Sequence, residues 1–198
     1  MLGGTVMRQA DKQPLRIENS LDILLVLLYA PSRSGETGEP IEGITRLQKL
    51  MFLLQQGLGP KKLVKMANQG LKFTPYKMGP YAESLQGDID ELLSVGLVRT
   101  ERLRYLIMDD GDAEEHEIEL DEGGEKRKVV ESLKYRLTDN GMKAGKELWE
   151  NIDEKSREEL AKFKSFFGSL SLRQLLIYVY EKYPKMTGES EIRRELGL

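Results

Sequence analysis

The fold is decided by residues 45–98, which read TRLQKLMFLLQQGLGPKKLVKMANQGLKFTPYKMGPYAESLQGDIDELLSVGLV. Thr45 and Gln48 have the spacing of a capping box, in which each side chain satisfies a backbone donor of the other residue at the start of a helix. Apolar residues then recur with a helical period. Gly57 provides the left-handed residue that commonly ends a helix. The pattern predicts a helix over residues 45–56.

Two more helices are predicted in the same stretch. Pro60 and Pro80 each suit the first position of a helix, where a missing backbone N–H costs nothing. We expect a short helix over residues 60–69 with its lysines outward, and a longer one over residues 80–95. An earlier apolar helix over residues 21–30, capped by Asn19 or Ser20, should be buried on most sides.

After Leu97 the apolar period changes to two, which is typical of strands. In the first arm Leu103 alternates with Arg102 and Arg104. The second arm alternates in the same way, with Leu133, Tyr135 and Leu137 against Lys134 and Arg136. Paired, these arms should form a hairpin whose solvent face is basic.

An acidic block separates the two arms, and a small extra hairpin is expected inside it around residues 118–120. Its ten carboxylates belong to Asp109, Asp110, Asp112, Glu114, Glu115, Glu117, Glu119, Asp121, Glu122 and Glu125. The predicted fold is therefore α+β and mainly helical: a winged helix-turn-helix with a long acidic wing and a C-terminal helical extension.

The chain is expected to divide into a flexible N-terminal arm (1–18), a winged-helix domain (19–140), a helical extension (141–184) and a tail (185–198). The extension carries an aromatic group that could form a homodimer: Phe163, Phe166, Phe167, Tyr178, Tyr180 and Tyr183. Packing of these rings within one subunit is the alternative.

Composition excludes several classes of chemistry. The 198 residues include no cysteine and one histidine, so thiol catalysis, disulfides and a cysteine zinc site are impossible. The histidine, His116, lies in the acidic block without a partner ligand. We expect no enzyme activity, no cofactor and no metal. No apolar run approaches the ~20 residues that a membrane span needs, so the protein is predicted to be cytoplasmic.

Two sets of residues resemble known families. The segment Gly96-Leu97-Val98-Arg99, followed by residues 135–141 (YRLTDNG), resembles the end of many winged-helix regulators. Residues 47–53 (LQKLMFL) and 76–81 (YKMGPY) are similar to the Panacea-type domain, a group that includes antitoxin-like and phage-associated proteins. The resemblance covers about residues 45–141. It implies either DNA-binding regulation or neutralisation of a protein, with no catalytic residue.

The first role, a DNA-binding transcriptional regulator, is the leading prediction, and protein binding is the alternative. In the first role, cationic side chains would bind the phosphates of double-stranded DNA. Residues 57–82 contain several lysines and no carboxylate, and lysine contacts with phosphates give salt-dependent affinity with little sequence information. The candidate DNA-binding residues are Lys61, Lys62, Lys65, Lys72, Lys77, Gln86, Arg102 and Arg104. The alternative for each lysine is a solvated helix face.

For the second role, a protein partner would be held by carboxylates. Glu83 and Asp90 lie on the outward face predicted for the helix after Pro80, where they would repel phosphates. Tyr76 and Tyr81 flank the preceding turn and could form a recognition pocket; the alternative is that they fix the angle at which the chain enters the helix. These four residues are the candidate partner-binding site of an antitoxin-like or adaptor protein, together with the acidic wing.

Overall fold

The computed structural model describes residues 15–108, 118–120 and 126–198 of the chain. The fold is α+β and mainly helical, as predicted. Its helices are α1 (Ser20–Tyr29), α2 (Ile44–Leu53), α3 (Lys61–Gly70), α4 (Glu83–Ser94), α5 (Asp139–Glu150), α6 (Glu154–Ser169) and α7 (Leu172–Lys182), with single turns η1 (Leu54–Leu58) and η2 (Pro184–Met186). Its strands are β1 (Ile41–Glu42), β2 (Val98–Met108), β3 (Ile118–Leu120) and β4 (Lys126–Leu137).

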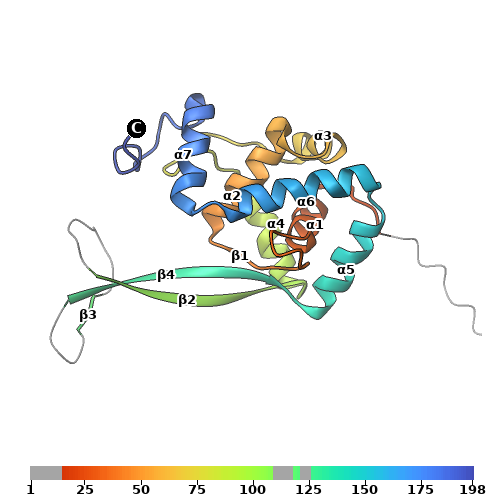
Figure 1. Cartoon of the computed structure of the whole chain (residues 1–198), viewed down its shortest axis with the longest axis horizontal. Coiled ribbons are helices and arrows are strands. Elements are labelled where there is room, and N and C mark those ends of the chain that lie inside the picture. Colours follow the sequence, from red (N-terminus) through yellow and green to blue (C-terminus); the bar gives the residue numbers. More distant parts are fainter. Residues whose placement is uncertain (1–14, 109–117, 121–125) are drawn as a thin grey trace, which may run out of the picture.

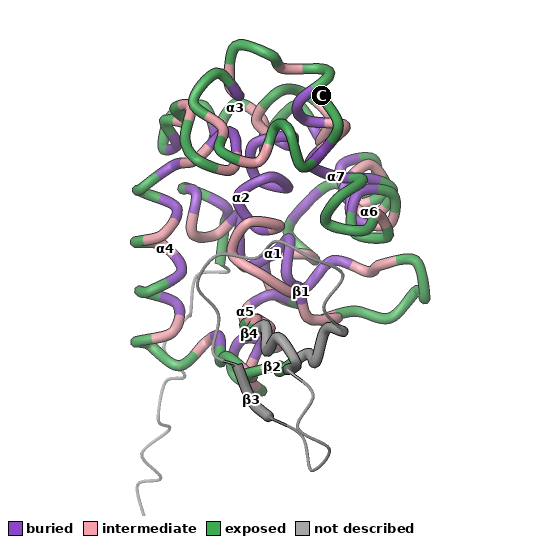
Figure 2. The backbone as a smooth tube through the Cα atoms, turned by 90° about the vertical axis from the view of Figure 1, so that its left-hand side faces the viewer, coloured by how far each residue is buried: buried purple, intermediate pink, exposed green. Residues whose placement is uncertain are grey.

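Helix α1 lies at the centre of the molecule, between α4 on one side and α6 and α7 on the other (Figure 2). Asn19 and Asp22 form a capping box at its start, which confirms Asn19 as the cap. Its last carbonyls have no partner within the helix. Lys164 of α6 reaches them, and its ammonium group donates to the Leu28 and Ala30 carbonyls at 2.8 and 2.7 Å. The buried ammonium group of Lys164 therefore caps the C-terminal end of α1.

The start of α2 differs from the predicted capping box. Helix α2 begins one residue earlier, at Ile44, and its N-cap is Gly43, which makes no side-chain capping bond. Gln48 does not form the predicted capping box because its amide binds the backbone of Ala82. It accepts from the Ala82 N–H at 2.9 Å and donates to the Ala82 carbonyl at 3.0 Å. A long-range pair of hydrogen bonds has replaced a local one. Gly57 has φ +91°, the left-handed conformation that was predicted.

Helix α4 begins at Glu83 instead of Pro80. Thr74 and Tyr81 form an antiparallel bridge with two backbone hydrogen bonds of 2.9 Å. The tight turn inside the bridge has Gly79 at φ +84°, with its N–H donating to the Tyr76 carbonyl. The bridge at Tyr81 and the extended conformation of Ala82 keep the helix from starting at Pro80.

The β2–β4 pairing corrects the predicted basic face. The strands are antiparallel, with Arg102 opposite Leu133 and Leu103 opposite Ser132. Residues directly opposite each other lie on the same face of a sheet. Arg102 and Arg104 therefore share a face with Leu133 and Tyr135, while Lys134 and Arg136 lie on the other face. The alternation was predicted correctly in each strand, but the register between them was not.

Strands β2 and β4 form a long two-stranded ribbon that projects from the helical body (Figure 1). At the body end β1 pairs with β4, so the sheet order is β1-β4-β2. At the far end β3 pairs with β4, as predicted for residues 118–120. The rest of the acidic block, with His116, lies outside the described residues.

Helices α5, α6 and α7 pack on α1 and α2, and most of the aromatic residues proposed for a dimer are used there. Phe163, Phe167 and Tyr180 are buried. Tyr183 contacts Phe52 of α2 with ring centroids 5.0 Å apart. Packing within one subunit thus accounts for these rings. Phe166 is the exception, at 58% exposure.

Both ends of the described chain pack on the body. In the arm, residues 1–14 lie outside the described residues, but Ile17 is buried, so residues 15–18 are not the loose segment that was predicted. The Leu15 N–H donates to a Glu147 carboxylate oxygen at 2.8 Å. In the tail, Leu196 is buried. Within the ranges described above, no helix is long and apolar enough to cross a membrane.

Candidate partner-binding site

The predicted DNA-binding residues do not form one surface. Lys61, Lys62 and Lys65 belong to α3, which lies at the upper right in Figure 1, whereas the ribbon with Arg102 and Arg104 extends to the lower left. The two groups therefore lie on different parts of the molecule.

Carboxylates accompany several of these cations. Lys77 forms a 3.1 Å salt bridge with Glu191 of the tail. Arg104 forms a 2.8 Å salt bridge with Glu131 across the ribbon. The Gln86 amide donates a hydrogen bond to Asp90 at 3.0 Å. Arg102 and Lys72 are exposed. The group therefore offers less free positive charge than the sequence indicated.

The outward face of α4 is acidic. Glu83, Asp90 and Glu91 are exposed, and the helix contains no lysine or arginine. Asp88 is half-buried, and its Oδ2 has no hydrogen-bond partner among the described residues. Burial raises the pKa of Asp88, the neighbouring Glu91 acts in the same direction, and a hydrogen bond from Ser20 opposes them. This face can attract cations but has no lysine or arginine that would pair with a phosphate.

Tyr76 and Tyr81, the residues predicted for a recognition pocket, lie side by side. Their ring centroids are 5.1 Å apart. Both rings line a cavity of about 220 Å³ between α2 and the turn at Gly79. Its other lining residues are Ile44, Thr45, Gln48, Lys49, Lys77 and Met78. Because Tyr76 is 48% exposed, the aromatic wall faces the solvent and is accessible to a partner.

Lys49 in the wall of this cavity was missed by sequence reasoning. Its side chain is 2% exposed, and its ammonium group donates to the Pro80 carbonyl at 2.9 Å. Burial lowers the pKa of Lys49 to about 7. The only signal in the sequence is that Gln48 and Lys49 interrupt the apolar run over residues 47–54. A polar pair inside a buried stripe indicates specific partners, but not which ones.

The tyrosine cavity lies just before the acidic helix in the chain. Tyr81 lines the cavity, and α4 begins two residues later with Glu83, so the first carboxylate of the helix follows directly on the cavity wall. In the described part of the chain, no three His, Cys, Asp or Glu side chains gather to hold a metal ion.

Comparison with known protein families, with curated proteins and with solved structures gives no match for this chain. The resemblance to the Panacea-type domain therefore stays a prediction. The geometry of the site carries the functional argument.

Proposed function

We propose that this protein is a partner-binding module of the antitoxin or adaptor kind, built on a winged-helix scaffold. The scaffold is supported by the order of its elements. Helix α1, strand β1 and helix α2 precede α4, which leads directly into the β2–β4 ribbon, and the sheet order is β1-β4-β2. In a DNA-binding protein of this type α4 would be the recognition helix that enters the major groove.

The observation that carries the proposal is the charge of α4. Its 12 residues include Glu83, Asp88, Asp90 and Glu91 and no basic residue. Base-reading side chains are typically Arg, Lys, Asn and Gln, and the only one of these on α4, Gln86, is bonded to Asp90. Carboxylates beside a phosphate backbone are repelled, whereas beside a basic protein surface they are attracted and steer association.

The tyrosine cavity indicates which other groups the partner segment should carry. A volume of about 220 Å³ beside two tyrosine rings suits one apolar side chain. The Lys49 ammonium group has donors beyond the one used by Pro80, and these could bind a carbonyl of the inserted segment. The expected partner segment thus has an apolar anchor followed by lysine or arginine residues that meet Glu83 and Asp90.

Selection from a random-peptide display library tests this proposal. Peptides selected on the wild-type protein should combine one large apolar residue with several basic residues. Their affinity should fall at least tenfold on the Glu83→Gln, Asp90→Asn, Glu91→Gln variant and on Tyr81→Ala. The matched control is Glu150→Gln with Glu158→Gln, which removes exposed carboxylates from α5 and α6 and should change nothing. Selected peptides that bind all these variants equally would refute the assignment.

DNA binding is the second candidate, favoured by the winged-helix order of elements and by the arginines of the ribbon. In that case the phosphates would be held by Lys61, Lys62 and Lys65. Reversing these three charges to glutamate should then abolish binding to a duplex, but should leave peptide binding by the acidic face unchanged. The two readings therefore make opposite predictions for a single variant.

A homodimer through α6 and α7 also stays a proposal. The exposed apolar side chains there are Phe166 and Leu172. If they form the contact, Phe166→Ser should convert a dimer to a monomer in sedimentation equilibrium.

A further inference from the structure

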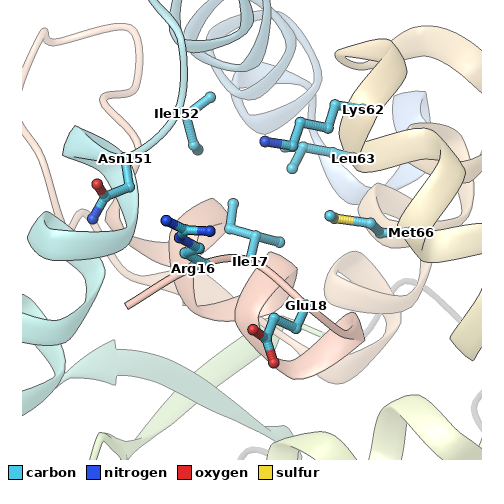
Figure 3. Close-up of a pocket in the computed structure, with 8 residues that line it drawn as sticks. All are labelled: Arg16, Ile17, Glu18, Lys62, Leu63, Met66, Asn151 and Ile152. Atoms are coloured by element: carbon cyan, nitrogen blue, oxygen red, sulfur yellow. The ribbon is translucent and has the colours of Figure 1, made fainter. Parts of the chain in front are cut away.

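A second cavity lies where residues 16–18 cross the body. Its volume is about 460 Å³, and it lies between this segment, α3 and the turn between α5 and α6. It is lined by Arg16, Ile17, Glu18, Lys62, Leu63, Met66, Asn151 and Ile152 (Figure 3). It is separate from the tyrosine cavity, and no lining residue is shared.

Two cationic head groups point into this cavity. In Figure 3 the Arg16 guanidinium and the Lys62 ammonium group are directed toward the same space beneath Ile152, although they come from segments 46 residues apart. Among the described residues, no carboxylate lies within 4.0 Å of either head group. Both side chains are exposed, and an anion bound between them would be attracted to both positive charges.

The nearby carboxylates are engaged elsewhere or directed away. Glu18 points away from the two cations in Figure 3. Asp153 caps α6, where it accepts from the Ser156 N–H and hydroxyl at 2.9 and 2.8 Å. These hydrogen bonds lower the pKa of Asp153, and Lys62 adds a smaller effect in the same direction. With Arg16 and Lys62 against Glu18, the lining residues keep a net positive charge, and Asp153 outside the lining offsets part of the Lys62 charge.

The remaining walls are apolar. Ile17, Leu63, Met66 and Ile152 contribute aliphatic or thioether groups, and none of the lining residues is aromatic. A guanidinium group binds planar oxyanions through two parallel N–H donors, and an ammonium group adds a point charge. A cavity of this size lies within the range of small-molecule sites.

We infer that this cavity binds a phosphomonoester that carries a short aliphatic body. The phosphate would lie between Arg16 and Lys62, and the body would lie against Met66 and its apolar neighbours. The ligand would join residues 15–18 to α3 and to the end of α5, where Asn151 already donates to the Leu15 carbonyl at 3.0 Å. This site gives Lys62 a role other than the DNA contact predicted for it. It does not depend on the proposed partner binding.

Calorimetric titration with hexyl phosphate, inorganic phosphate and hexanol tests the inference. Hexyl phosphate should bind one site and raise the melting temperature with concentration, as a ligand of the folded state does. Inorganic phosphate should bind at least tenfold more weakly because it lacks the apolar body, and hexanol should not bind. Arg16→Gln with Lys62→Gln should weaken hexyl phosphate binding at least tenfold; Lys62→Gln alone should weaken it several-fold.

The matched control is Lys61→Gln with Lys65→Gln. These lysines belong to the same helix and are exposed, but they do not line the cavity. The control should bind hexyl phosphate like the wild type, and Met66→Gln should remove the advantage of hexyl phosphate over inorganic phosphate. The inference is wrong if hexyl phosphate does not bind the wild type, or if both double variants lose affinity equally, since general electrostatic attraction would then explain the binding.

Discussion

The side-chain amide of Gln48 binds both backbone groups of Ala82, with hydrogen bonds of 2.9 and 3.0 Å across 34 residues of sequence. The next residue, Lys49, donates to the Pro80 carbonyl. Two consecutive side chains of α2 thus fix the segment that leads into α4. This arrangement holds the tyrosine cavity next to the acidic face, which is the relationship that the proposed function requires.

Replacing Gln48 by Leu should destabilise the protein by about 2–4 kcal/mol, because it leaves a buried N–H and a buried carbonyl of Ala82 without partners. Urea unfolding at neutral pH measures the change in the free energy of unfolding. Gln56→Leu is the control, since Gln56 is exposed and its replacement should change stability by less than about 0.5 kcal/mol. Equal effects of the two substitutions would show that the Ala82 contacts contribute nothing.

Lys49→Met should change the pH dependence of stability. Burial lowers the folded-state pKa of Lys49 to about 7, while the unfolded chain keeps its proton up to about pH 10.4. Between these values the unfolded state binds more protons, so the free energy of unfolding of the wild type should rise with pH, by up to about 1.4 kcal/mol per pH unit.

The methionine variant lacks this titration and should be most stable relative to the wild type at pH 6. Its relative stability should then decline from pH 7 to 9. Urea unfolding of both proteins at pH 6, 7, 8 and 9 measures the difference. Parallel curves would show that Lys49 is not desolvated in the folded state.

Lys164→Met should cost about 1–3 kcal/mol at neutral pH, since the Leu28 and Ala30 carbonyls at the end of α1 lose their donor. Lys162→Met on the same helix is the control, because Lys162 is exposed and forms only a surface ion pair with Glu158. Thermal unfolding followed by circular dichroism compares the two. A loss in the control as large as in Lys164→Met would contradict the capping role.

The ribbon register predicts which engineered cysteines can be joined. Leu103 lies opposite Ser132, so Leu103→Cys with Ser132→Cys should form a disulfide on mild oxidation. Arg102→Cys with Ser132→Cys should not, because residue 102 points to the other face. The chain has no other cysteine, so a thiol titration reads the result directly. Cross-linking of the second pair but not the first would support the register that was expected from the sequence.

Features with a local cause were predictable from the sequence. Asn19, one of the two caps predicted for α1, accepts from the Asp22 N–H three positions later. The stop at Gly57 was predictable because it depends only on the left-handed backbone conformation of that residue. Tyr76 and Tyr81 could be placed together because a tight turn joins them.

Features that depend on distant residues were not predictable. Whether the Gln48 amide forms a capping box with Thr45 or bonds to the Ala82 backbone depends on which segment packs against α2. The strand register cannot be read from alternation, because each arm satisfies its own period in either register. The direction of Lys62 likewise depends on residues 16–18, which sequence reasoning had treated as a loose arm.

The central claim is that the acidic face of α4 binds a basic protein partner and does not read DNA. The most direct measurement is the fluorescence anisotropy of a labelled mixed-sequence duplex titrated with the protein at about 50 and 200 mM salt, a range over which phosphate-driven binding weakens sharply. We predict no saturable binding at either concentration. Saturable binding at the lower concentration that weakens steeply at the higher one, and that is lost when Lys61, Lys62 and Lys65 are changed to glutamate, would contradict the claim.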